Sequence, residues 1–147
     1  MDPYLLKQSL HKDFHYTLSL IFDFLKDNYG VDEMERIMKK VGSIVYAPLI
    51  KDMKENGLDA IEKHMKELMD LEDGIYESEK QGNSITFRIK KCPAIDHMKN
   101  KDLDVSDDFC RISTGLVSQE IARGAGYRFS VDFDQDKGQC IQKFWKE

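Results

Sequence analysis

The sequence predicts an α+β fold in which an N-terminal helical layer packs on an antiparallel sheet of about four strands. Two observations support this prediction. The apolar period changes from three or four residues to two near residue 74, and the second half holds two hairpin patterns separated by a helical one. A chain of 147 residues buries enough surface for one core, so we expect a single domain over 1–147, helical over 1–73 and sheet-rich over 74–147.

The N-terminal region carries the spacing of an amphipathic helix. Its apolar series runs from Leu6 to Tyr29 and predicts one long helix or two abutting ones. Asp2 and Pro3 supply a helix start, and Gly30 supplies a stop. This segment is therefore the first part of the helical layer.

Two further helices complete the first half of the chain. Asp32 and Glu35 form a capping-box pattern that predicts the start of the second helix, which Pro48 must break or kink. Asp59 and Glu62 repeat the capping box and predict the start of a third helix. We expect the apolar sides of these helices to face the sheet.

The second half of the chain alternates apolar and polar residues. The segments 75–79 and 85–90 predict one hairpin across a Gly-Asn turn. Ser106 has the position of an N-cap for the helix that follows. The segments 127–133 and 139–145 then predict a second hairpin.

The charge of the chain excludes some classes of partner. It contains 22 Lys plus Arg against 27 Asp plus Glu, a formal net charge of −5. Nucleic-acid binding needs a basic stripe that displaces condensed counterions, so we expect no nucleic-acid partner. No leader pattern stands at the N-terminus, and the early apolar run 18–22 is too short for a membrane span. We therefore expect a cytoplasmic protein without a membrane partner.

The three cysteines, Cys92, Cys110 and Cys140, are the main candidates for chemistry. An odd number is typical of a reduced protein rather than of a disulfide framework. They fall at a predicted strand end, helix start and final strand, and docking of that helix on the sheet would bring their sulfurs into one pocket. The position of Cys110 near a helix N-terminus predicts a lowered pKa. The alternative is that each cysteine is a small apolar side chain that fills core space.

Histidines offer a base or a metal ligand near one of these thiols. His97 follows Cys92 by about one turn of a short predicted helix, where it could act as a base or as a fourth metal ligand. The alternative is a solvated histidine. His11 and His15 are four residues apart on a helix without a third ligand, so we expect a surface pair, and we expect His64 at the core boundary.

Four arginines lie in the same half of the chain as the cysteines. A planar guanidinium suits recognition of a carboxylate, so these residues predict a small, carboxylate-bearing substrate or ligand. The alternative is that they are ordinary surface residues. The four are Arg88, Arg111, Arg123 and Arg128.

The residues around the cysteines form a pattern known from a protein family. The pattern is Lys91-Cys92-Pro93, then Phe109-Cys110, then Gly138-Gln139-Cys140 ahead of Phe144. In these motifs the chain resembles the L-2-amino-thiazoline-4-carboxylic acid hydrolase family of small α+β proteins, over about residues 85–144. The order of helices and hairpins is also similar to that of the 4-vinyl reductase type of ligand-binding domain.

The resemblance implies a hydrolase that opens a 2-amino-thiazoline ring. Water adds to the amidine-like carbon, the ring C–S bond breaks, and N-carbamoyl-cysteine forms. In one version, Cys92 is the attacking thiolate and His97 is its base. In another, Cys92, Cys110 and Cys140 hold a zinc ion whose open position binds water. An iron–sulfur cluster with one non-cysteine ligand is also compatible with three thiols.

A second class of function competes with the hydrolase. In that class the domain is a non-enzymatic sensor or carrier, which binds a small molecule between sheet and helices while the cysteines hold a structural or regulatory metal. A third possibility is a partner-binding module with three core cysteines. A domain this small and helix-faced is also compatible with a homodimer.

Overall fold

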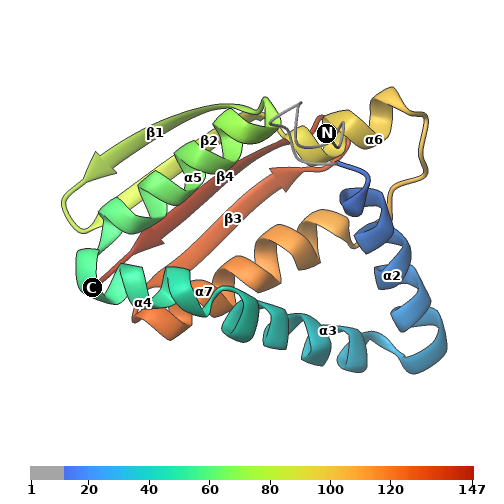
Figure 1. Cartoon of the computed structure of the whole chain (residues 1–147), viewed down its shortest axis with the longest axis horizontal. Coiled ribbons are helices and arrows are strands. Elements are labelled where there is room, and N and C mark those ends of the chain that lie inside the picture. Colours follow the sequence, from blue (N-terminus) through green and yellow to red (C-terminus); the bar gives the residue numbers. More distant parts are fainter. Residues whose placement is uncertain (1–11) are drawn as a thin grey trace, which may run out of the picture.

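Helices form one layer and an antiparallel sheet forms the other (Figure 1). The structure is a computed structural model, and it describes residues 12–147. The helical segments are α2 (Phe14–Tyr29), α3 (Val31–Lys40), the π-helical η1 (Val41–Val45), α4 (Ala47–Asn56), α5 (Leu58–Glu72), α6 (Pro93–Asn100), the π-helical η2 (Arg111–Leu116) and α7 (Val117–Ala125). The strands are β1 (Ile75–Gln81), β2 (Ser84–Lys91), β3 (Arg128–Asp134) and β4 (Gln139–Trp145). The predicted α+β class is confirmed.

The sheet joins the two predicted hairpins through their second strands. Its order is β1-β2-β4-β3, and every neighbouring pair is antiparallel. At the centre of the sheet Ile85 pairs with Phe144 and Ile89 pairs with Cys140, so two segments far apart in the sequence lie side by side. This pairing brings the end of β2 next to the start of β4.

One face of the sheet packs against the helices. Ile85, Phe87 and Phe144 are buried on that face, whereas Arg88 and Lys143 on the opposite face are exposed. In Figure 1, α5 runs across the front of the sheet, and α7 lies beside β3. The strand alternation read from the sequence therefore corresponds to a covered face and a solvent face.

The two π-helical segments lie at the contact between α3, α4 and α7. A Cβ on Gly42 would stand 2.7 Å from Cβ of Glu120 and 3.1 Å from the backbone oxygen of Val117. Because real Cβ atoms do not approach so closely, only glycine permits η1 to pack this tightly on α7. The helix broken before Pro48 resumes as α4 with that proline in its first turn, as predicted.

The capping box predicted at Asp32 and Glu35 is not formed. Helix α3 begins directly after Gly30, and no side chain caps it. Glu35 instead pairs with Arg111, with 2.7 Å between Oε1 and Nη1. Gly30 has a φ of 89°, so its backbone turns the chain without help from a side chain.

The capping box predicted at Asp59 and Glu62 is also not formed. Helix α5 begins directly after Gly57, which has a φ of 66° and no side-chain cap. Both carboxylates pair with Lys80 of β1. A long-range ion pair has displaced the local cap at each helix start. The helix start predicted at Asp2 and Pro3 lies outside the described residues.

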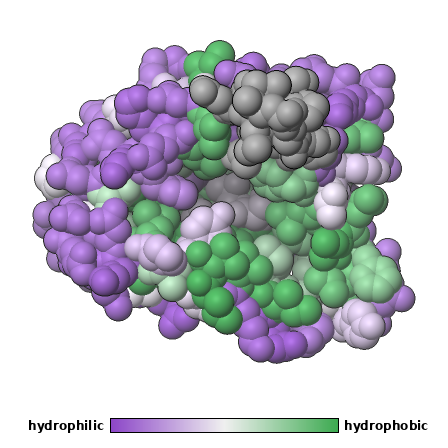
Figure 2. Space-filling view, viewed as in Figure 1, coloured by the Kyte–Doolittle hydropathy of each residue, from purple (hydrophilic) through white to green (hydrophobic). Residues whose placement is uncertain are grey.

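Polar and apolar residues are unevenly distributed over the helical side of the molecule. Figure 2 shows a hydrophilic region on the left, over α5 and the β1–β2 hairpin, and apolar residues in the centre and on the right, toward α2. The exposed apolar side chains include Leu20 and Phe24 on α2 and Ile44 and Val45 in η1. Within residues 12–147, no helix combines the length and the apolar character needed to cross a bilayer.

Candidate functional site

The three cysteines come together from three segments of the chain. Cys92 stands between the end of β2 and the start of α6, Cys140 lies in β4, and Cys110 precedes η2. All three thiols are free and half-buried. Their charges influence one another, since a Cys92 or Cys140 thiolate raises the pKa of Cys110 and a Cys92 thiolate raises that of Cys140. The three thiols therefore lie within range of one another's charge, and we call them the thiol cluster.

The pKa of Cys110 is opposite to the sequence prediction. Burial raises it to about 12, and the neighbouring Cys92 and Cys140 act in the same direction. The nearby helix start was expected to lower this pKa, and that prediction is wrong. The desolvation of the thiolate outweighs the favourable dipole of the helix.

Cys92 has a different environment, because opposing influences act on its thiol. Burial raises the pKa of Cys92, and the nearby backbone N–H groups of Ile95 and Ala94 lower it. The negative charges of Glu72 and Asp96 raise it further. Cys92 is therefore the thiol of the cluster that also faces the amides of a helix start.

Cys140 is the third member of the thiol cluster. Burial raises its pKa, and Gln142 counteracts this by donating a hydrogen bond of 3.4 Å from Nε2 to Sγ. Gln142 is itself buried at 7% exposure. The thiols are thus neutral at rest, and a base is needed to form a thiolate.

The turn between β3 and β4 fixes Cys92. Its backbone N–H donates a hydrogen bond of 2.9 Å to the backbone oxygen of Gly138. Gly138 has a φ of 65°, and a Cβ there would lie 3.1 Å from Cγ2 of Ile95. A glycine is needed for both reasons, since the turn requires the left-handed region and the space is filled.

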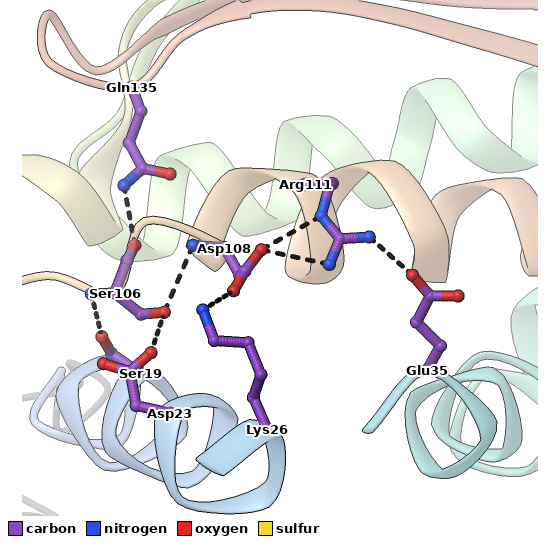
Figure 3. A network of polar contacts seen from close by, with 8 residues as sticks. All are labelled: Ser19, Asp23, Lys26, Glu35, Ser106, Asp108, Arg111 and Gln135. Atoms are coloured by element: carbon purple, nitrogen blue, oxygen red, sulfur yellow. Dashed lines mark hydrogen bonds and ion pairs between the residues drawn. The ribbon is translucent and has the colours of Figure 1, made fainter. Parts of the chain in front are cut away.

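The same turn fixes Cys110 through the side chain of Gln135. Its Oε1 accepts a hydrogen bond of 2.9 Å from the backbone N–H of Cys110, and its Nε2 donates one of 2.8 Å to the backbone oxygen of Ser106. Figure 3 shows the amide of Gln135 pointing at the loop before η2. One amide therefore joins the hairpin to the segment that carries Cys110.

Ser106 makes the hydrogen bond expected of an N-cap, although the π-helical segment itself begins only after Cys110. Its Oγ accepts a hydrogen bond of 3.2 Å from the backbone N–H of Asp108 and donates one of 2.6 Å to Asp23. Its own backbone N–H donates to Oγ of Ser19 at 2.7 Å. Ser19 and Asp23 belong to α2, so this cap also ties α2 to the start of the Cys110 segment (Figure 3).

A chain of ion pairs continues from the cap toward α3 (Figure 3). Nζ of Lys26 lies 2.8 Å from Asp108, whose other oxygen lies 3.1 Å from Arg111. Arg111 also reaches Glu35. The hydrogen bond from Lys26 is the main cause of a lowered pKa at Asp108. These contacts hold α2, α3 and η2 in one arrangement beside the thiol cluster.

His97 forms an imidazole–carboxylate pair. Its Nε2 lies 2.9 Å from Oδ1 of Asp13, and Nζ of Lys101 lies 2.8 Å from the same oxygen. The imidazole is 17% exposed, so it is not the freely solvated side chain that was the alternative. His97 belongs to α6, the helix that Cys92 precedes. A carboxylate that holds one ring nitrogen fixes the orientation of the other.

His15 forms a second pair, with Glu72. Nε2 of His15 and Oε1 of Glu72 are 2.6 Å apart, and the two side chains are 12% and 2% exposed. His15 was expected in a surface pair with His11, and for His15 this prediction is wrong. His11 lies outside the described residues. Since 57 positions separate His15 from Glu72, no local spacing in the sequence indicated this pair.

The thiols were also predicted to hold a metal. Within the described residues 12–147, no group of three or more His, Cys, Asp and Glu side chains is placed to hold a metal ion. The raised pKa of each thiol adds to the cost of the thiolates that a metal requires. The arrangement of these side chains therefore does not fit zinc or an iron–sulfur cluster.

Three of the four candidate arginines are occupied by carboxylates of the same chain. Arg111 binds Asp108 and Glu35, Arg123 binds Glu120, and Arg128 binds Glu147. Arg88 is exposed on the solvent face of the sheet, away from the helices. None of these four is aimed at the thiol cluster by a contact among the described residues.

One surface groove lies between α4 and α5 and is not lined by any of the three cysteines. It has a volume of about 400 Å³, and Tyr46, Leu49 and His64 contribute to its wall. His64 is half-buried against the ring of Tyr46, which agrees with its predicted boundary position, and burial lowers its pKa. The second groove, of about 270 Å³, is lined by Leu58, Lys80 and Tyr127 among others, and neither groove is lined by a cysteine.

The comparisons with known proteins assign the chain to no family. Neither a protein-family model nor a curated protein sequence matches the chain. The thiol cluster and its two imidazole–carboxylate pairs are therefore interpreted from their own chemistry.

Proposed function

We propose that the protein is a thiol-dependent hydrolase of the L-2-amino-thiazoline-4-carboxylate type. One observation carries the proposal: Cys92 stands in a cluster of three thiols and directly precedes a helix that carries an imidazole paired with a carboxylate. Nucleophile, base and orienting group from separate parts of a chain are the usual components of covalent catalysis. The substrate class comes from the sequence motifs around the three cysteines.

Cys92 is the nucleophile in this proposal. Its thiol faces the N–H groups of Ala94 and Ile95, which stabilise a thiolate, whereas burial keeps the resting thiol neutral. A neutral thiol needs a base at the moment of attack. His97 supplies that base, and Asp13 holds its imidazole in position.

The reaction is the addition of water across the ring C–S bond. Cys92 attacks the amidine-like carbon, the ring sulfur leaves, and water then releases N-carbamoyl-cysteine from the enzyme. The substrate carboxylate needs a cation, and Lys12 is the candidate in this proposal. Its Nζ lies 2.5 Å from the backbone oxygen of Glu72, at the end of α5. No step of the proposal uses a metal, because the described side chains do not fit one.

Hydrolysis of L-2-amino-thiazoline-4-carboxylate by the purified protein tests the proposal. The released thiol is followed with a chromogenic disulfide, with the enzyme's own thiols measured separately. We expect Cys92→Ser to lose at least about a thousandfold in kcat/KM, in line with the loss of other nucleophiles. Lys90→Ala, a change on the solvent face, serves as the matched control. Turnover by Cys92→Ala at the wild-type rate contradicts the proposal.

A non-enzymatic small-molecule sensor or carrier is the second candidate. The observation that favours it is the raised pKa of all three thiols, because neutral thiols are poor nucleophiles. In this case the groove beside Tyr46 and His64 is the binding site. Native mass spectrometry of protein purified from cells tests it, since a retained small molecule together with absent thiazoline hydrolysis favours this function.

A further inference from the structure

A buried carboxylate lies within range of the Cys92 thiol, and its side chain takes no part in the attack by Cys92 or the proton transfer to His97. Glu72 is the last residue of α5 and is 2% exposed. Burying an ionised carboxylate is costly unless it is paired, and its side-chain partner is His15 at 2.6 Å. Replacing such a pair by apolar residues is often neutral or stabilising, so its presence needs another explanation.

The backbone places this pair beside Cys92. Two residues after Glu72, a Cβ on Gly74 would meet, besides Met69 of α5, Cδ of Pro93 at 3.2 Å and the backbone oxygen of Lys91 at 3.4 Å. The end of α5 therefore packs against the corner that carries Cys92. The charge of Glu72 reaches the thiol as well, since it raises the pKa of Cys92.

Ring opening needs two proton transfers at different positions. The attacking thiol gives up a proton on one side of the reacting carbon, and the leaving ring sulfur takes one on the other side. His97 serves the first transfer in the proposed mechanism. A second acid is needed for the leaving sulfur, and an imidazole–carboxylate pair that holds one mobile proton can provide it.

We propose that Glu72 and His15 form the second acid–base pair of the thiol cluster; this inference rests on the proposed hydrolase function. As the bond from Cys92 Sγ to carbon forms, the thiol proton goes to His97. The ring C–S bond breaks with its electron pair on sulfur, which takes the proton held by the pair.

The second half of the reaction restores both groups. Water attacks the same carbon and gives one proton to the Glu72–His15 pair. The bond from that carbon to Cys92 breaks with its electrons on sulfur, and the thiolate recovers its proton from His97. One water is consumed, and each acid–base group returns to its starting state.

Glu72→Gln separates a chemical role from a structural one. Glutamine keeps a hydrogen bond to His15 but carries neither charge nor an exchangeable acid proton. We expect Cys92 to react roughly threefold faster with iodoacetamide at pH 8, because a negative charge beside its thiol is lost. We also expect hydrolysis to slow by about a hundredfold. Faster alkylation of Cys92 alone, with Cys110 and Cys140 unchanged and turnover slowed, distinguishes this role from a loosened fold, which would expose all three half-buried thiols.

Mass spectrometry assigns the alkylation to each cysteine, and two variants complete the experiment. Glu120→Gln, which changes a buried carboxylate paired with Arg123, is the matched control and leaves both rates at the wild-type level. His15→Gln provides an independent slow-turnover variant if Glu72→Gln does not fold. Unchanged rates in Glu72→Gln, or a joint loss of both, overturn the inference. Wild-type protein that hydrolyses no thiazoline contradicts the proposed function, and unchanged Cys92 alkylation in Glu72→Gln still overturns the role of Glu72.

Discussion

The side-chain oxygen of Gln135 accepts a hydrogen bond of 2.9 Å from the backbone N–H of Cys110. The amide nitrogen of the same residue binds Ser106, so both polar atoms of one turn residue hold the segment that precedes η2. The position of Cys110 relative to Cys92 and Cys140 therefore depends on a residue outside all three of their elements.

Gln135→Ala removes this support. The backbone groups of Ser106 and Cys110 lose partners in a partly buried place, which we expect to cost about 1–3 kcal/mol of unfolding free energy. Urea denaturation measures the loss. Gln139→Ala is the control, because the exposed side chain of Gln139 makes, among the described residues, only a hydrogen bond of 3.3 Å to the backbone oxygen of Lys90. Equal losses in the two variants contradict the bridging role of Gln135.

Gly42→Ala tests the close contact between η1 and α7. The added Cβ would lie 2.7 Å from Cβ of Glu120, so one of the two segments must move. We expect a loss of about 1–3 kcal/mol, as for other overpacked sites. Gly115→Ala in η2 is the matched control, because its Cβ meets nothing nearer than 3.7 Å. Thermal unfolding of the two variants should separate them, and a Gly42→Ala protein as stable as wild type would show that the contact is loose.

Asp108→Asn should change how the free energy of unfolding depends on pH in the acidic range. The pKa of Asp108 is lowered in the folded state, mainly by the hydrogen bond from Lys26. As pH falls, the Asp108 carboxylate therefore takes up its proton in the unfolded chain before it does so in the folded protein. The stabilisation by ionised Asp108 is present above the ordinary pKa of 3.8 and is lost as pH falls through the lower pKa of the folded state. We expect the difference in unfolding free energy between wild type and variant to shrink below pH 4. Lys26→Met should reduce the same pH dependence, and a difference that stays constant down to pH 2.5 is the contrary result.

Cys110→Ala should change stability at alkaline pH. The folded pKa of Cys110 is about 12, against an ordinary value of 9.0, so the unfolded chain loses this proton first as pH rises. The contribution is present below pH 9 and is lost between pH 9 and pH 12. We expect the stability difference between wild type and Cys110→Ala to decrease over this window in urea titrations. A difference that is the same at pH 8 and pH 11 would place Cys110 in contact with solvent.

Much of the fold was predictable from residue spacing. The change of period near residue 74 located the transition from α5 to β1, and the turn patterns located both hairpins. Ser106 was identified as an N-cap because its side chain acts within two residues, at Asp108. Local chemistry of this kind is visible in a sequence.

The rest depended on contacts between distant residues. Glu35 and Glu62 had the spacing of capping boxes, yet basic side chains from other segments bind both. The Glu72–His15 pair has no local signature at all. The pKa of Cys110 was predicted in the wrong direction, because its burial depends on the packing of the whole domain. Long-range ion pairs and desolvation are properties of the assembled fold.

The order of the strands has a consequence for how the protein reaches its folded state. Each hairpin can form early from neighbouring residues, but β2 and β4 pair across about fifty intervening positions, as Ile89 and Cys140 do. Contacts of such long sequence separation form slowly, since a large loop must close first. Cys92 directly follows the first hairpin and Cys140 lies in the second, so their thiols become neighbours only when the hairpins dock. The time at which these two cysteines become protected from alkylation during refolding should therefore show when β2 and β4 pair.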